Sequence, residues 1–185
     1  MIKYAKVINQ ETGLCEVGTG TNAEFYKSIG MIELDVEHSD IDNNWYLIEK
    51  CPHKSEEEKL REAKDTKYQE ALQKAYSFQQ EGTVEYKNCV FEMSDSNRKN
   101  LSDTEEALKL MGKDSAIWND KDDNLVTLTI EDIQYIRLNL ILSRIQKLWI
   151  EQYPAYKEQI EEASTIEEVE SIIIDYSVLP NVSEE

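Results

Sequence analysis

Apolar and polar residues in the first 30 positions form the pattern of a strand pair followed by a short helix. Two β-rich runs within 4–18 flank a turn that ends at Gly13, which is typical of a hairpin. Segment 22–30 starts with an asparagine suited to cap a helix and ends with a glycine suited to terminate one. We therefore expect a β-hairpin and then one short helix.

A second strand pair is predicted after this helix. Residues 32–36 alternate apolar with acidic side chains, and an apolar run at 45–48 follows the turn-forming residues 40–44. Cys51-Pro-His53 then breaks regular structure, because proline lacks a backbone donor and restrains the residue before it. The pattern predicts a small antiparallel ββαββ-like module over 1–54.

A highly charged helix is predicted over 55–80. It opens with Ser55-Glu-Glu-Glu58, a capping box in which serine and glutamate satisfy free backbone donors of the first turn. Its apolar stripe is patchy, and the early part has too little apolar surface to be buried within one chain. We interpret it as a spacer helix that packs near its C-terminal end, with its start either solvated or against the same helix of another subunit.

Two further hairpins are predicted in the remaining segment, 81–185. Residues 82–91 alternate around a Lys87-Asn88 turn, and a second pair of β-rich runs flanks the acidic turn 120–124. Each hairpin is followed by a helical pattern. We therefore expect a mixed hairpin-and-helix domain.

Capping residues mark three helices in this segment. The first should stop at Gly112, the second has a broad apolar face from Ile133 to Trp149 that Pro154 interrupts or restarts, and the third carries Tyr176. The expected fold is α+β and ends in a helical pair. The caps are Ser102-Asp-Thr-Glu105, Thr129-Ile-Glu-Asp132 and Thr165-Ile-Glu-Glu168.

The net charge of −18 and the pI near 4.5 narrow the range of partners. Nucleic acid is disfavoured, because neutralising its backbone needs clustered Lys and Arg. Membranes are disfavoured by the same repulsion, and no apolar run approaches the roughly 20 residues of a spanning helix. The amino terminus lacks the apolar stretch of a secretory signal, so we expect synthesis in a cytoplasm.

Two groups of residues have the composition of metal sites. Glu131 is the twelfth position counted from Asp120, as in a calcium loop, but Leu125 stands where that loop requires glycine. We expect a solvated hairpin turn there, and the sequence leaves cation binding open. Cys15, Cys51 and His53 would give zinc three soft ligands, but structural zinc sites use four ligands in close pairs. We expect a boundary loop with an exposed histidine, and no metal or cofactor.

Candidate catalytic residues are not found in the sequence. It has no serine elbow, no Gly-rich phosphate loop and no cysteine near a plausible His/Asn pair. Trp45, Tyr46 and Trp149 are instead the candidate interaction residues, because large aromatic side chains serve more often as core or interface anchors than as sugar-stacking platforms. We expect them to anchor packing or subunit contacts.

Patterns of strands and aromatic positions in two parts of the chain carry a resemblance to a known group of proteins. In the first part they are Ile2-Lys-Tyr-Ala-Lys-Val-Ile-Asn-Gln-Glu-Thr-Gly13, Phe25-Tyr-Lys-Ser-Ile-Gly-Met31 and Asn44-Trp-Tyr46. This part looks like the module that opens many small tail-fibre-region proteins of phages and prophages from gut Firmicutes. In the second part, from about Tyr68, they are Val84 to Phe91, Ile117-Trp118, Val126 to Thr129 and Ile166 to Val169. This part resembles a phage-associated domain of uncharacterised function.

The resemblance implies a role in the virion tail or its assembly, and it brings no catalytic residues. One interpretation is a non-enzymatic structural protein of the virion tail, made in the bacterial host cytoplasm, that contacts tail, baseplate or fibre proteins as symmetric copies. The other is a tail-fibre assembly chaperone that binds an unfinished fibre. A glycan-cleaving enzyme would need an open cleft with a perturbed carboxylate pair, of which the sequence gives no sign.

Overall fold

A computed structural model describes residues 1–177 and confirms an α+β fold. The chain forms two compact units, which we call the barrel unit (Met1–Arg61) and the helical unit (from Glu62 onward). The boundary between them falls inside the charged helix α2 (Glu56–Glu81), whereas the sequence suggested boundaries at 54 and 80. The greater part of the predicted spacer therefore belongs to the helical unit.

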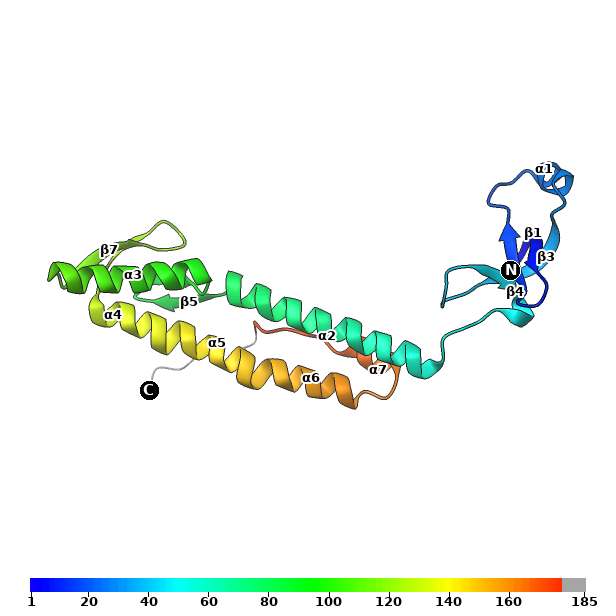
Figure 1. Ribbon diagram of the computed structural model, residues 1–185. Coiled ribbons are helices and arrows are strands. Elements are labelled where there is room, and N and C mark those ends of the chain that lie inside the picture. Colours follow the sequence, from blue (N-terminus) through cyan, green and yellow to red (C-terminus); the bar gives the residue numbers. More distant parts are fainter. Residues whose placement is uncertain (178–185) are drawn as a thin grey trace. The chain divides into compact units, whose positions relative to one another are not determined.

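The barrel unit is a closed ring of four antiparallel strands (Figure 1). β1 and β4 each pair with both β2 and β3, so the ring has no open edge. The order ββαββ agrees with the sequence prediction, and a short 3-10 turn, η1 (Ile48–Lys50), ends the unit's last strand. The elements are β1 (Ile2–Asn9), β2 (Leu14–Val17), α1 (Ala23–Ser28), β3 (Ile32–His38) and β4 (Trp45–Leu47).

The interior of the barrel unit is filled by small side chains, because four strands enclose little space. Its centre consists of Ala5, Cys15 and Val36, with larger apolar residues around them only partly buried. The Lys3 Nζ atom lies over the Trp45 ring, 3.9 Å from its centre. The barrel unit is thus held together by a small core and a complete ring of strand pairs.

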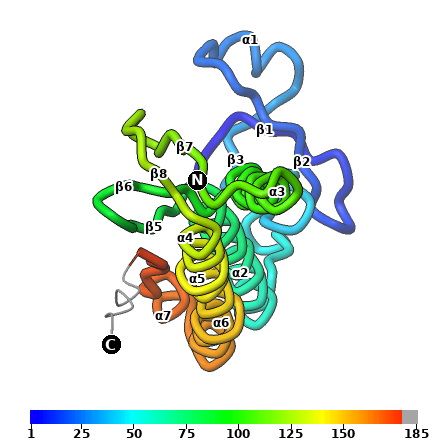
Figure 2. The backbone as a smooth tube through the Cα atoms, turned by 90° about the vertical axis from the view of Figure 1, so that its left-hand side faces the viewer, coloured from blue at the N-terminus to red at the C-terminus, as the bar shows by residue number. Residues whose placement is uncertain are grey.

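The helical unit is built on two long helical segments that lie side by side (Figures 1 and 2). The first is α2, and the second runs without a break from residue 130 to 162. Ala71 and Ala75 of α2 are fully buried against Leu148, Ile160 and Tyr176, and their small side chains allow the helices to approach closely. The second segment comprises α4 (Ile130–Gln134), η2 (Tyr135–Leu142), α5 (Ser143–Lys147), η3 (Leu148–Gln152) and α6 (Tyr153–Glu162).

Two hairpins and a helix cover the other end of the second helical segment. Their apolar side chains form a core with Ile133, Ile136 and Ile141. Lys87 and Asn88 both have positive φ, 51° and 59°, as the two-residue turn of the first hairpin requires. The elements are β5 (Thr83–Tyr86), β6 (Cys89–Glu92), α3 (Asp95–Met111), β7 (Ser115–Asn119) and β8 (Leu125–Thr129).

The predicted start of α3 at the Ser102 capping box is wrong. The helix is capped eight residues earlier, where the Ser94 side chain accepts a hydrogen bond from the Asn97 backbone N–H. Ser102 therefore lies inside the helix, and Glu105 is used for ion pairs instead of for capping. The predicted stop at Gly112 is confirmed, because this residue has the left-handed conformation that ends helices.

The second helical segment contains two π-helical stretches, η2 and η3, which the sequence pattern did not predict. Backbone angles stay helical through Gln152 and Tyr153, and Pro154 lies in the first turn of α6, where a missing N–H is tolerated. The last helix, α7 (Ile166–Ser171), has the predicted capping box at Thr165 but ends before Tyr176, which packs beyond it. Among residues 1–177 no helix is long and apolar enough to cross a membrane.

Candidate functional site

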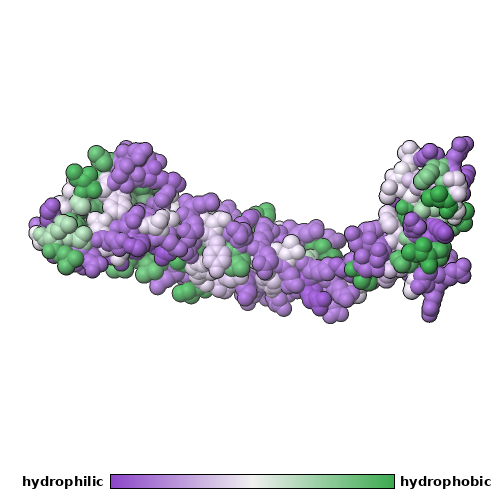
Figure 3. Space-filling model, turned by 45° about the horizontal axis from the view of Figure 1, so that its top comes forward, coloured by the Kyte–Doolittle hydropathy of each residue, from purple (hydrophilic) through white to green (hydrophobic). Residues whose placement is uncertain are grey.

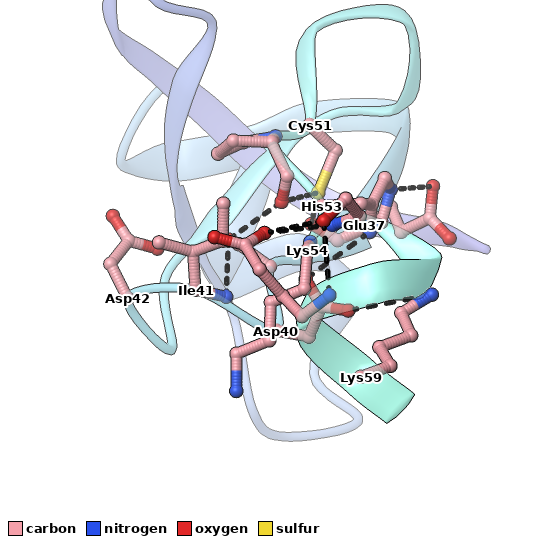
Figure 4. A network of polar contacts seen from close by, with 12 residues as sticks. Glu37, Asp40, Ile41, Asp42, Cys51, His53, Lys54 and Lys59 are labelled. Atoms are coloured by element: carbon pink, nitrogen blue, oxygen red, sulfur yellow. Dashed lines mark hydrogen bonds and ion pairs between the residues drawn. The ribbon is translucent and has the colours of Figure 1, made fainter. Parts of the chain in front are cut away.

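A cluster of polar side chains lies at one end of the barrel unit (Figure 4). Glu37 is near the end of β3, Asp40 is in the following turn, and Cys51 and His53 come after β4 and its 3-10 turn. β3 and β4 are hydrogen-bonded neighbours, so the segments that leave them meet. The His53 Nε2 atom is 3.4 Å from Glu37 Oε2, and its Nδ1 atom is 3.7 Å from Asp40 Oδ1.

Cys51 faces the same cluster. One ligand atom each from Glu37, Cys51 and His53 can be chosen so that all three lie within 4.8 Å of one another. The Cys51 thiol is half-buried and makes only long contacts, 3.7 Å to the Glu37 carbonyl oxygen and 3.9 Å to the Pro52 carbonyl oxygen. A thiol, an imidazole and a carboxylate therefore converge on one small volume.

The two loops that carry these residues are fastened to each other by hydrogen bonds. The buried Ser39 hydroxyl donates to the Pro52 carbonyl oxygen at 2.8 Å, and the Lys54 backbone N–H donates to Asp40 Oδ1 at 2.8 Å. In the turn that follows β3, the Asp42 carboxylate accepts a hydrogen bond from the Tyr46 hydroxyl at 2.6 Å. The hydrogen bonds from Ser39 and Lys54 thus hold the two loops in register.

The pKa shifts of the titratable groups in this cluster differ in direction. Burial, followed by the charges of Glu37, Asp40 and Asp42, raises the pKa of the Cys51 thiol. The backbone N–H of Lys54 is the main cause of the lowered pKa of Asp40. Hydrogen bonds from Tyr46 and then Asn44 lower the pKa of Asp42 to about 2. Asp40 and Asp42 are therefore ionised at neutral pH, and the Cys51 thiol is protonated.

The three aromatic residues singled out in the sequence do not form one site. Tyr46 is buried, and Trp45 is half-buried with its ring edge against His38 at 4.9 Å. Trp149 belongs to the helical unit, where its Nε1–H donates to Gln79 at 2.6 Å and its ring contacts two tyrosines. In the described residues all three make packing contacts within their own unit.

Of the three soft ligands considered in the sequence, only two come together. Cys15 lies in the centre of the barrel, and its thiol donates to the Gly13 carbonyl oxygen at 3.2 Å. Glu37 and Asp40 take its place beside Cys51 and His53, and sequence reasoning missed both. With 38 carboxylates in the chain, only the pairing of β3 with β4 distinguishes these two from the rest.

The acidic turn 120–124 is organised by hydrogen bonds from the protein itself. The Asp120 carboxylate is buried and accepts from the backbone N–H groups of Val90, Asp122 and Asn124 at 3.0, 2.9 and 2.7 Å. The expectation of a solvated turn is therefore wrong for Asp120, although the four residues after it are exposed. Its oxygens join this turn to β6.

Two more buried carboxylates lie in the helical unit, and both are neutralised by cations. Glu105 is paired with Lys109 and Arg137, and Asp132 is paired with Lys87 at 2.7 Å. The hydrogen bond from Lys109 is the main cause of the lowered pKa of Glu105. Burial raises the pKa of Asp132, but hydrogen bonds from Lys87, Thr129 and Tyr86 outweigh it and hold that pKa well below its usual range. A general acid would need the opposite shift.

Large apolar side chains are exposed on the barrel unit (Figure 3). Five of its apolar residues are buried, namely Ala5, Cys15, Met31, Val36 and Tyr46. Eight large apolar residues are exposed, namely Met1, Ile2, Ile8, Phe25, Ile29, Ile32, Ile41 and Ile48. This unit thus exposes more large apolar side chains than the number of apolar residues it buries.

Comparisons with known proteins add no family to this picture. No family model matches the chain, and neither a curated protein nor a solved structure matches it significantly. The functional argument therefore rests on the residues and on their geometry.

Proposed function

We propose that this protein is a non-enzymatic, tail-associated structural protein of a bacteriophage that acts through protein–protein contacts, with the barrel unit as its docking module. The observation that carries the contact role is the excess of exposed apolar side chains on that unit. Large exposed apolar patches on soluble proteins mark interaction sites. The phage setting is supported by the resemblance of residues 2–13, 25–31 and 44–46 to tail-fibre-region proteins.

Helix α1 is the best candidate for the centre of the docking surface. It has six residues, none of them buried; Phe25 within the helix is 53% exposed, and Ile29 at its C-cap is 46% exposed. Tyr26 holds the helix in place, because its ring stacks on Tyr4 at 6.0 Å and its hydroxyl accepts a hydrogen bond from the Gly20 backbone N–H at 2.6 Å. A helix this short gains little from its own hydrogen bonds, so a partner that covered its apolar side would stabilise it.

Both units carry a net negative charge. Residues 1–61 carry seven Lys/Arg and twelve Asp/Glu, a net charge of −5, whereas residues 62–185 carry 13 and 26, a net charge of −13. Strong net charge favours solubility and opposes close association of like surfaces. Because the net charge per residue is similar in the two units, the assignment of docking to the barrel unit rests on its exposed apolar side chains and not on charge.

The test measures association before and after removal of the apolar contacts of α1. Purified protein is studied by light scattering, alone and with the fibre protein encoded beside it, together with a Phe25→Ser/Ile29→Ser variant. Burying each side chain is worth about 1.5–3 kcal/mol, so the double variant should weaken association at least about tenfold. The matched control is Leu110→Ser/Ile173→Ser, because these side chains are 81% and 84% exposed in the helical unit.

The proposal is contradicted if the wild-type protein associates with neither itself nor the fibre protein, or if the α1 variant and the control behave alike. Mass spectrometry of purified particles adds a second criterion. A structural protein is present there in fixed stoichiometry, whereas a chaperone would occur only in lysates of infected cells.

A further inference from the structure

We propose that Glu37, Cys51 and His53 form a binding site for a divalent transition metal of the zinc class. The inference is independent of the proposed docking role, because these side chains belong to the polar end of the barrel unit and not to α1. It rests on the kinds of ligand atoms present, on their separations and on the carboxylate behind the histidine (Figure 4).

The ligand atoms favour zinc over the hard cations. On binding a metal, Cys51 would release its thiol proton to solvent and coordinate as a thiolate. A thiolate, an imidazole and a carboxylate form a mixed sulfur, nitrogen and oxygen set, which is typical of zinc sites, whereas calcium and magnesium take oxygen ligands. Three protein ligands would leave one tetrahedral position for water or for a group from another molecule.

The separations are close to those of a tetrahedral site. With bonds of about 2.0–2.1 Å to nitrogen and oxygen, two such ligands on one zinc ion stand about 3.3 Å apart. The observed distance from His53 Nε2 to Glu37 Oε2 is 3.4 Å. With all three ligand atoms within 4.8 Å of one another, a small rotation of side chains at this exposed edge completes the coordination.

Asp40 has the position of a carboxylate that orients a metal-bound histidine. When His53 Nε2 binds a metal, its Nδ1–H faces Asp40 Oδ1, which is 3.7 Å away. Asp40 is itself held by the Lys54 backbone N–H at 2.8 Å. Metal-binding histidines usually donate their other N–H to such a partner, which fixes the ring and strengthens the ligand.

The simpler interpretation is an ion pair of a protonated His53 with Glu37 and Asp40. That interpretation gives Cys51 no role, although its thiol lies in the same group and makes only long contacts to carbonyl oxygens.

Titration of the full chain with Co²⁺ and Zn²⁺ tests the proposal. Cobalt bound by a thiolate gives a charge-transfer band in the near ultraviolet, and calorimetry gives the zinc affinity and stoichiometry. We expect one ion per chain, an affinity at least about 100-fold lower for Cys51→Ser and for His53→Gln, and one about 10–100-fold lower for Asp40→Asn. The controls His38→Gln and Cys89→Ala change the other histidine and a thiol of the helical unit, and should bind as the wild type does.

A second measurement needs no variant and therefore does not depend on the folding of one. The wild-type protein is alkylated with and without Zn²⁺, and the modified cysteines are identified by mass spectrometry. We expect Zn²⁺ to slow the alkylation of Cys51 at least about tenfold and to leave Cys15 and Cys89 unchanged. Absence of the thiolate–cobalt band, or equal rates at Cys51 with and without Zn²⁺, would overturn the proposal.

Discussion

Replacement of Asp132 by alanine should destabilise the helical unit more than most single substitutions. The side chain joins the first hairpin to the start of α4: one oxygen accepts from the Tyr86 hydroxyl at 2.7 Å, and the other from Lys87 Nζ at 2.7 Å and the Thr129 backbone N–H at 2.9 Å. It also completes the capping box with Thr129. Asp132→Ala removes all of these interactions at a residue that is 7% exposed.

The size of the effect follows from the three interactions. Lys87 is 48% exposed at its side chain, so solvent screens its ion pair and limits the contribution to less than about 1 kcal/mol. The half-buried Tyr86 hydroxyl donates to a charged acceptor, which is worth about 1.5 kcal/mol or more. The helix cap adds about 1 kcal/mol. We therefore expect a loss of about 3 kcal/mol for Asp132→Ala and of about 1.5 kcal/mol for Tyr86→Phe.

Urea unfolding followed by tryptophan fluorescence measures this loss. A Trp45→Phe background leaves Trp118 and Trp149, so the signal reports the helical unit alone. The double variant Asp132→Ala/Tyr86→Phe should cost less than the sum of the single variants, because both remove the same hydrogen bond. A loss under about 1 kcal/mol for Asp132→Ala, or strict additivity of the two changes, would refute the reasoning.

The remaining predictions concern pH, packing and the first hairpin turn. The folded-state pKa values of Asp132 and Glu105 are lowered, so the stability that these carboxylates contribute is present above a pH of about 4.3 and is lost as the pH falls below it. Urea unfolding midpoints measured over a range of pH should therefore fall less steeply at acid pH in Asp132→Asn than in the wild-type protein. Ile160→Ala should cost about 2–5 kcal/mol, because this fully buried residue packs on α2, and a thermal melt showing a smaller loss would contradict the packing. Asn88→Val should cost about 1–2 kcal/mol, since valine tolerates a φ of 59° poorly, whereas Asn88→Gly should be tolerated in the same unfolding assay.

Local patterns determined the elements that depend on neighbouring residues. The hairpin turn at Lys87-Asn88, the helix end at Gly112 and the cap at Thr165 were all predicted, because each is set by backbone angles and side-chain hydrogen bonds within a few residues. The predicted start of α3 was wrong because Ser102-Asp-Thr-Glu105 has the sequence pattern of a capping box but lies inside the helix. The helix is capped by Ser94, and Leu101, which precedes the predicted cap, is a buried core residue within the helix.

The sequence alone pointed to two of the four residues of the candidate metal site and its supporting carboxylate. Cys51-Pro-His53 stands out because cysteine and histidine are rare in this chain, which has three and two of them. Glu37 and Asp40 are two among 38 carboxylates, and nothing local distinguishes them. They reach His53 because β3 pairs with β4, a contact between segments separated by a turn, and this pairing places their side chains beside the loop that follows β4.

The sequence by itself determined the α+β class, the order of elements in the barrel unit and the strongly acidic charge of the chain. Only the tertiary structure decided that the four strands close into a ring, that α2 packs through Ala71 and Ala75, and which apolar residues remain exposed. The physical reason is that hydrophobic periodicity reports one side of an element, whereas burial depends on what faces that side. Phe25 and Ala71 illustrate this, because an aromatic side chain is left exposed while a methyl group is fully buried.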